Sequence, residues 1–177
     1  MDETEKQYRA TATNNKKYPK RLTDYITELV KLGRILEAKH LFLELCNIKP
    51  NHSKTIRLGY TIAIATFDDE QVVKYDRLLV SSAIDVREIL WFQLRYYHSR
   101  NNTLACKTTI DALFEHRLDF DQLSTIIGIC LERQSYTITE SLARYLAKNR
   151  LTLSSRTNSW LKQIVITKLM NIIQRSK

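Results

Sequence analysis

The scarcity of glycine and proline is the feature that most restricts the fold of this chain. Its 177 residues include only three Gly and two Pro. Sandwiches and barrels use both residue types in their many turns, and phosphate-binding loops need clustered Gly. At 44% hydrophobic and 27% charged residues, the chain is also too apolar for a disordered protein. These observations predict an all-α protein with short polar connections.

Apolar side chains recur at helical spacing from Arg21 onward. The first stripe consists of Leu22, Tyr25, Ile26, Leu29 and Val30. Such spacing places the five side chains on one face of a helix. Gly33 ends this helix, and a second stripe runs from Ile35 to Leu45 before Pro50. The pattern predicts an antiparallel pair of helices joined by a tight turn.

Polar turn signals then repeat along the chain. They fall at Gly33, Asp68, Asn101 and Gln134, in steps of about 35, 33 and 33 residues. This period predicts an α-solenoid of about four antiparallel helix hairpins, over residues 21–51, 54–85, 87–119 and 121–153. An amphipathic helix over 157–175 is predicted to cap the last hairpin. Residues 19–177 would form a single helical-repeat domain. Residues 1–18 would form a flexible polar tail, with a short helix around Glu5 to Arg9.

The first hairpin resembles a tetratricopeptide repeat. The small Ala38 is followed by Phe42, Leu45 and Pro50 at offsets of four, seven and twelve residues. The third hairpin keeps part of the pattern, and the second and fourth keep only its period. The pentatricopeptide repeat, a family of RNA readers, has nearly the same signature, but fitting it requires dropping two positions. An irregular helical bundle is the third interpretation.

The resemblance implies a concave groove, lined by the first helix of each pair, that binds peptides or helices of other proteins. Some members of the family clamp a C-terminal carboxylate there with Lys and Asn. Thr23 and Thr27 stand at the matching positions, which argues against such a clamp. The residues that the repeat register assigns to the groove are Thr23, Thr27, Arg57, Thr61, Arg95 and Ser99.

The chain is strongly basic, with a formal net charge of +9. Residues 131–177 contribute most of the excess, because they hold nine Lys or Arg against two Glu. The proposed basic patch consists of Lys16, Lys17, Lys20, Arg21, Arg144, Lys148, Arg150 and Arg156. These side chains either contact an acidic partner or nucleic-acid phosphates, or form a solvated surface. Trp91 belongs to an aromatic run interleaved with Arg95 and Arg100, and it is either an aromatic anchor for a ligand or part of the core.

The sequence carries no motif for catalysis, metal binding or a cofactor. Its four His and three Cys lack the spacing of zinc ligands. The separated cysteines, the acidic start and the absence of an 18-residue apolar run predict an intracellular protein that is neither secreted nor membrane-bound. Cytoplasm and nucleus are the expected compartments, and a mitochondrial location stays open.

Together these features predict a non-enzymatic binding module without metal or cofactor. It would act as an adaptor or scaffold, or as a subunit of a larger complex, and hold an acidic protein partner in its groove and basic patches. The alternative function is a pentatricopeptide-like protein that contacts single-stranded RNA. Membrane docking is the least favoured reading, because the apolar face of the last helix is needed to cap the repeats.

Overall fold

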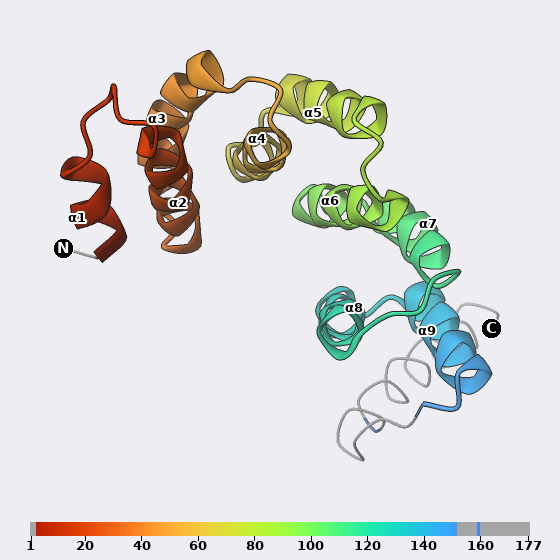
Figure 1. The fold of residues 1–177 in the computed structure, drawn as a ribbon. Helices are drawn as coiled ribbons and strands as arrows, with labels where there is room; N and C mark the ends of the chain where they lie inside the picture. The colour runs from red at the N-terminus through yellow and green to blue at the C-terminus, as the bar shows by residue number, and fades with distance from the viewer. Residues whose placement is uncertain (1–2, 152–158, 160–177) are drawn as a thin grey trace, which may run out of the picture. The chain divides into compact units, whose positions relative to one another are not determined.

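The computed structural model describes residues 3–151 and residue 159. In this part of the chain all regular structure is helical and no strand occurs, which confirms the predicted all-α class (Figure 1). The chain divides into two compact units, Met1–Phe92 and Gln93–Lys177. Helix α6 (Val86–Ser99) crosses the boundary and contributes residues to both units. The predicted capping helix lies outside the described residues, apart from residue 159.

The first unit is built around helices α2 and α4. Its helices are α1 (Glu3–Arg9), α2 (Tyr18–Lys31), α3 (Ile35–Ile48), α4 (Ser53–Ala65), α5 (Asp69–Ser81) and the first half of α6. Helix α2 packs against α1, α3 and α4, and α4 also packs against α3 and α5. Leu22, Ile26 and Leu29 on α2 are fully buried, as their spacing predicts. Ala38 on α3 is also fully buried, which suits a small residue between closely packed helices.

Gly59 marks a very close approach of α4 to two of its neighbours. It is buried in the middle of α4. A Cβ atom at this position would lie 2.3 Å from Cζ of Tyr75 on α5 and 2.7 Å from Cζ of Phe42 on α3. The two rings meet edge to face, with centroids 6.2 Å apart. Three helices therefore converge where only glycine leaves room for both aromatic side chains.

The second unit contains the end of α6 and three further described helices. These are α7 (Thr103–Leu113), α8 (Phe120–Arg133) and α9 (Tyr136–Lys148). Helix α9 packs against both α7 and α8. Cys106 and Cys130 are buried in this unit as free thiols, and Cys46 in the first unit is a half-buried free thiol. Burial raises the pKa of the Cys130 thiol to about 12, so its sulfur stays protonated at neutral pH.

One type of helix end recurs in the chain. Gly33, Phe67 and Asn101 each follow a helix with a positive φ, of 74°, 57° and 56°. At all three places the amide of this residue donates to the carbonyl three residues back, and the next amide donates to the carbonyl five residues back. This left-handed cap satisfies the last carbonyls of the helix. The same end follows α5 at Ala83 and α9 at Arg150. The ends of α2, α4 and α6, at residues 33, 67 and 101, are spaced by 34 residues.

Side-chain caps start the helices that follow two of these turns. The Asp68 carboxylate accepts a hydrogen bond from the Gln71 amide at 3.2 Å. The Asn102 side chain accepts one from the Ala105 amide at 3.0 Å. Asp69 follows Asp68 in the first turn of α5, so this acidic cluster acts in capping and in compensating the helix dipole.

Part of the predicted polar tail packs against the first unit. Helix α1 includes the short helix that was predicted around Glu5 to Arg9, and it contacts α2. The ring of Tyr8 stacks on that of Tyr25, with centroids 5.0 Å apart. Tyr18 is buried, and its hydroxyl donates to a carboxylate oxygen of Glu44 at 2.7 Å. This segment packs on the first unit instead of forming a free tail because Tyr8 and Tyr18 supply aromatic contacts. A count of aliphatic residues does not detect these contacts.

Two glycine-to-alanine substitutions are expected to change stability in opposite directions. Gly59→Ala should lower the free energy of unfolding by about 1–3 kcal/mol, because Tyr75 and Phe42 would have to move. Gly128→Ala should raise it by about 0.5–1 kcal/mol, because alanine favours helix and a Cβ there meets nothing within 4 Å. Urea denaturation followed by circular dichroism measures both. Similar values for the two variants would contradict the close approach at Gly59.

Candidate functional site

A groove in the first unit lies along α1, α2 and α4. Its volume is about 550 Å³. The residues that line it, called the α2–α4 groove below, are Thr4, Thr23, Asp24, Thr27, Glu28, Lys31, Lys54, Arg57, Leu58 and Thr61. Four of the six predicted groove residues are therefore brought together, two from α2 and two from α4. The pairs share a face because each is spaced by four residues.

The threonine hydroxyls of the groove bond back to their own helices. Thr23 donates to the Pro19 carbonyl at 2.7 Å, and Thr27 donates to the Thr23 carbonyl at 2.8 Å. Thr61 on α4 donates in the same way to the Arg57 carbonyl at 3.0 Å. Since a hydroxyl has one proton and two lone pairs, each oxygen can still accept a hydrogen bond. The groove therefore offers acceptors that suit the N–H groups of an extended peptide.

The charges of the groove are partly compensated within the unit. Arg57 forms a two-pronged ion pair with Glu88 on α6, in which Nη2 lies 2.7 Å from Oε2. This contact raises the pKa of the Arg57 guanidinium. Lys31 pairs with Glu28 at 3.2 Å. Lys54 is exposed and has no ion-pair partner among the residues that the structure describes. An anionic ligand would therefore meet Lys54 directly and could compete with Glu88 for Arg57.

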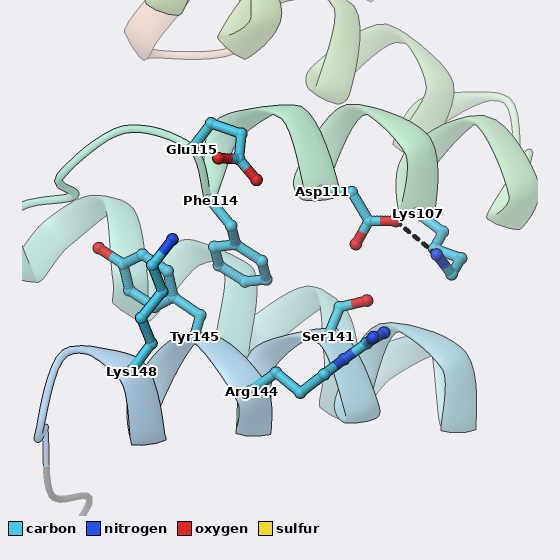
Figure 2. A pocket seen from close by; sticks show the side chains of 8 residues that line it. All are labelled: Lys107, Asp111, Phe114, Glu115, Ser141, Arg144, Tyr145 and Lys148. Atoms are coloured by element: carbon cyan, nitrogen blue, oxygen red, sulfur yellow. Dashed lines mark hydrogen bonds and ion pairs between the residues drawn. The ribbon is translucent and has the colours of Figure 1, made fainter.

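A second pocket lies between α7 and α9 in the second unit (Figure 2). Its volume is about 440 Å³. The residues that line it, called the α7–α9 pocket below, are Lys107, Asp111, Phe114, Glu115, Ser141, Arg144, Tyr145 and Lys148. The ring of Phe114 stacks on that of Tyr145, with centroids 4.5 Å apart and planes 18° apart. The Tyr145 hydroxyl accepts a hydrogen bond from the Leu118 amide at 3.0 Å, which holds this ring in place.

Polar groups meet across the α7–α9 pocket. Figure 2 shows the side chains of Asp111 and Ser141 directed toward each other, with Lys107 paired to Asp111. Burial tends to raise the pKa of the Asp111 carboxyl, but Lys107, the nearby Ser141 hydroxyl and the charge of Arg144 outweigh it. The pKa therefore lies below its ordinary value. Ser141 Oγ is buried and directed toward this carboxylate.

Two predicted basic residues, Arg144 and Lys148, line the α7–α9 pocket. Both are exposed and lie one turn apart on α9. Neither forms an ion pair with any residue in the described ranges. Sequence reasoning identified these two cations but missed Phe114 and Ser141. The sequence feature that could have identified Ser141 is its position in the apolar stripe of α9, three residues after the buried Ile138.

The remaining predicted basic residues do not line either pocket. Lys16, Lys17 and Lys20 are exposed around the start of α2. Arg21 donates a hydrogen bond to the Gln7 side chain, which ties α2 to α1. Arg150 is exposed just after α9. Arg156 lies outside the described residues.

The predicted residues of α6 also lie outside both pockets. Arg95 is exposed, and Ser99 is half-buried with its hydroxyl donating to the Tyr96 carbonyl at 2.7 Å. Trp91 is half-buried, and its indole N–H is buried without a hydrogen bond among the described residues. The partial burial of Trp91 is equally compatible with a ligand anchor that is partly exposed and with a residue of the core.

His98 belongs to a polar cluster at the end of α6. Its Nδ1 lies 2.8 Å from an Arg133 nitrogen, and its Nε2 lies 3.1 Å from a Glu132 oxygen. A neutral ring accepts from Arg133 through Nδ1 and donates to Glu132 through Nε2. Burial and the charge of Arg133 lower the pKa of His98, while Glu132 opposes them. Protonation of His98 therefore costs more in the folded chain than in the unfolded chain.

This cluster predicts a loss of stability as the pH falls through the ordinary His98 pKa of 6.5. Below that pH the unfolded chain binds the proton first, so unfolding becomes more favourable until the folded pKa is also passed. Urea midpoints at pH 7.5, 6.5 and 5.5 should fall more steeply for the natural chain than for His98→Gln. Parallel pH profiles for the two proteins would contradict the assignment.

No protein-family model, curated protein or solved structure matches the chain. Within residues 3–151 and 159, no group of three His, Cys, Asp or Glu side chains is placed to hold a metal ion. None of the helices in this part combines the length and apolar character needed to cross a membrane.

Proposed function

We propose that this chain is a non-enzymatic binding module, an adaptor or a subunit of a larger complex. The α2–α4 groove would hold an extended peptide segment of an acidic partner protein. The observation that carries the proposal is the meeting of Thr23, Thr27, Arg57 and Thr61 in one groove. A repeat register, read from the sequence, assigns these residues to a common ligand surface, and two different helices supply them.

The architecture that accompanies this proposal is a stack of antiparallel hairpins similar to tetratricopeptide repeats. The left-handed ends of α2, α4 and α6, at Gly33, Phe67 and Asn101, support it, because these three ends are spaced by 34 residues. Within the first unit, α2 packs against α3, α4 packs against α5, and α2 packs against α4. This is the order of contacts that stacked hairpins produce.

The chemistry of the groove suits a peptide with acidic side chains. The hydroxyl oxygens of Thr23, Thr27 and Thr61 can accept from backbone N–H groups. Lys54 and Arg57 can pair with carboxylates of the ligand. The net charge of +9 attracts an acidic partner from a distance and speeds its association. Free thiols at Cys46, Cys106 and Cys130 fit a partner inside a reducing compartment.

Site-specific photocrosslinking tests where the partner binds. A benzophenone amino acid in place of Thr27 or Thr61 should crosslink to a protein in native cell extract, because both positions line the α2–α4 groove. The matched control is Thr125 on α8, an exposed threonine whose hydroxyl bonds to its own helix in the same way. The adduct should survive nuclease treatment and be absent at Thr125. A nuclease-sensitive adduct would support RNA instead, and the absence of an adduct at both positions would contradict the groove.

Glu88→Gln tests whether Arg57 is available to an acidic ligand. Removing the Glu88 charge releases the guanidinium, so affinity for a labelled decamer of glutamate should rise about 2–5-fold. Arg57→Gln should lower the affinity. The control is Glu140→Gln, which changes the net charge equally at an exposed residue of α9. Fluorescence anisotropy at low salt measures all three. Equal affinities for Glu88→Gln and Glu140→Gln would show that the ion pair does not restrain Arg57.

A further inference from the structure

We propose that the α7–α9 pocket is a second ligand site, which binds the carboxylate of an acidic side chain together with a neighbouring apolar group. The inference rests on the proposed function only in taking a partner peptide as the source of this carboxylate. All lining residues come from α7, from α9 or from the two residues that follow α7. The chemistry of the pocket is therefore argued without reference to the α2–α4 groove.

Ser141 supplies a buried polar group to the pocket. Its residue is only 4% exposed. In Figure 2 its hydroxyl lies on the side of α9 that faces α7 and is directed toward Asp111. The Asp111 carboxylate is paired with Lys107 and can also accept the Ser141 proton, because it has further lone pairs. Binding of a ligand carboxylate therefore falls to the cations of α9.

Arg144 and Lys148 supply positive charge beside this hydroxyl. Both are exposed, and neither has an ion pair in the described part of the chain, so they can turn toward a ligand without breaking a bond. A guanidinium binds the two oxygens of a carboxylate with two parallel hydrogen bonds.

The charge balance of the pocket selects a ligand with a single negative charge. Its lining holds three cations, Lys107, Arg144 and Lys148, against two carboxylates, Asp111 and Glu115. The excess of one positive charge matches one carboxylate. A phosphate monoester carries about −1.5 to −2 at neutral pH and would be repelled by the exposed Glu115. The pocket is therefore assigned to Asp or Glu side chains rather than to phosphorylated residues.

Phe114 accounts for the apolar part of the ligand. Its ring is half-buried and rests on Tyr145, so one part of it is covered and another faces the pocket. Aromatic groups of a ligand would stack on such a ring in an offset or edge-to-face arrangement. A volume of about 440 Å³ accepts a group of the size of two side chains.

Titration of the isotope-labelled full chain with blocked dipeptides of Phe and Glu, in both orders, tests the assignment by NMR. Amide shifts should concentrate on residues 107–115 and 141–148. Replacing Glu by Gln in the dipeptide should weaken binding about tenfold or more, because the charged hydrogen bonds are lost. Replacing Glu by phosphoserine should not strengthen it. An aliphatic control with Glu but without Phe should bind more weakly.

Three protein variants separate the roles of the pocket residues. Arg144→Gln should weaken binding of the Phe and Glu dipeptide about tenfold. Ser141→Ala should change the affinity less than Arg144→Gln does, because the Ser141 hydroxyl faces Asp111 rather than the ligand. Arg117→Gln removes an exposed arginine outside the pocket and should leave the affinity unchanged.

Equal binding of the Glu and Gln dipeptides, or unchanged affinity in Arg144→Gln, would overturn the assignment. Tighter binding of the phosphoserine dipeptide would overturn the selection of a single charge. The failure of this proposal is distinguishable from that of the proposed function. Missing crosslinks at both Thr27 and Thr61 would contradict the groove, whereas the dipeptide shifts report on α7 and α9 alone.

Discussion

The convergence of α3, α4 and α5 at Gly59 holds helix α4 in place, and through α4 it shapes the α2–α4 groove. Tyr75 and Phe42 approach the backbone of α4 so closely that no side chain fits between them. The next residue, Tyr60, stacks on Phe92 of α6 with ring centroids 4.8 Å apart. Residues 57 and 61 flank this tightly packed segment and carry Arg57 and Thr61 to the groove. The ligand surface that we propose is therefore positioned by aromatic packing on the opposite side of the same helix.

The fold class and the helix positions could be predicted because they depend on local physics. The stripe of Leu22, Tyr25, Ile26 and Leu29 is buried because helical spacing puts these residues on one face. The period could be read from Gly33 and Asn101, which adopt the left-handed conformation more easily than other residues. Phe67 takes the same conformation without any such preference, so the tertiary context decides that turn. The docking of α1 depends on Tyr8 meeting Tyr25, a contact between segments that no periodic pattern reveals.

The two candidate sites differ in how much of each the sequence predicts. Thr23, Thr27, Arg57 and Thr61 follow from a repeat register, since helices at equivalent places in a repeat present equivalent faces. The α7–α9 pocket does not follow a register, because Phe114 comes from the residues just after α7 and Ser141 occupies a core position of α9. Arg144 and Lys148 stand out in the sequence as charges, but only the structure places an aromatic ring and a buried hydroxyl beside them. The charges of Arg144 and Lys148 therefore identify this region in the sequence. The side chains packed beside them determine which ligand groups the pocket can bind.

Nuclear Overhauser effects at Gly59 test the convergence of the three helices most directly. In the labelled full chain, the α protons of Gly59 should show strong effects to ring protons of both Tyr75 and Phe42, with ring-current shifts in the same α protons. These signals require α3 and α5 to meet α4 as described, which is the arrangement that supports the α2–α4 groove. Effects from Gly59 only to its own helix would contradict this packing and the groove that depends on it.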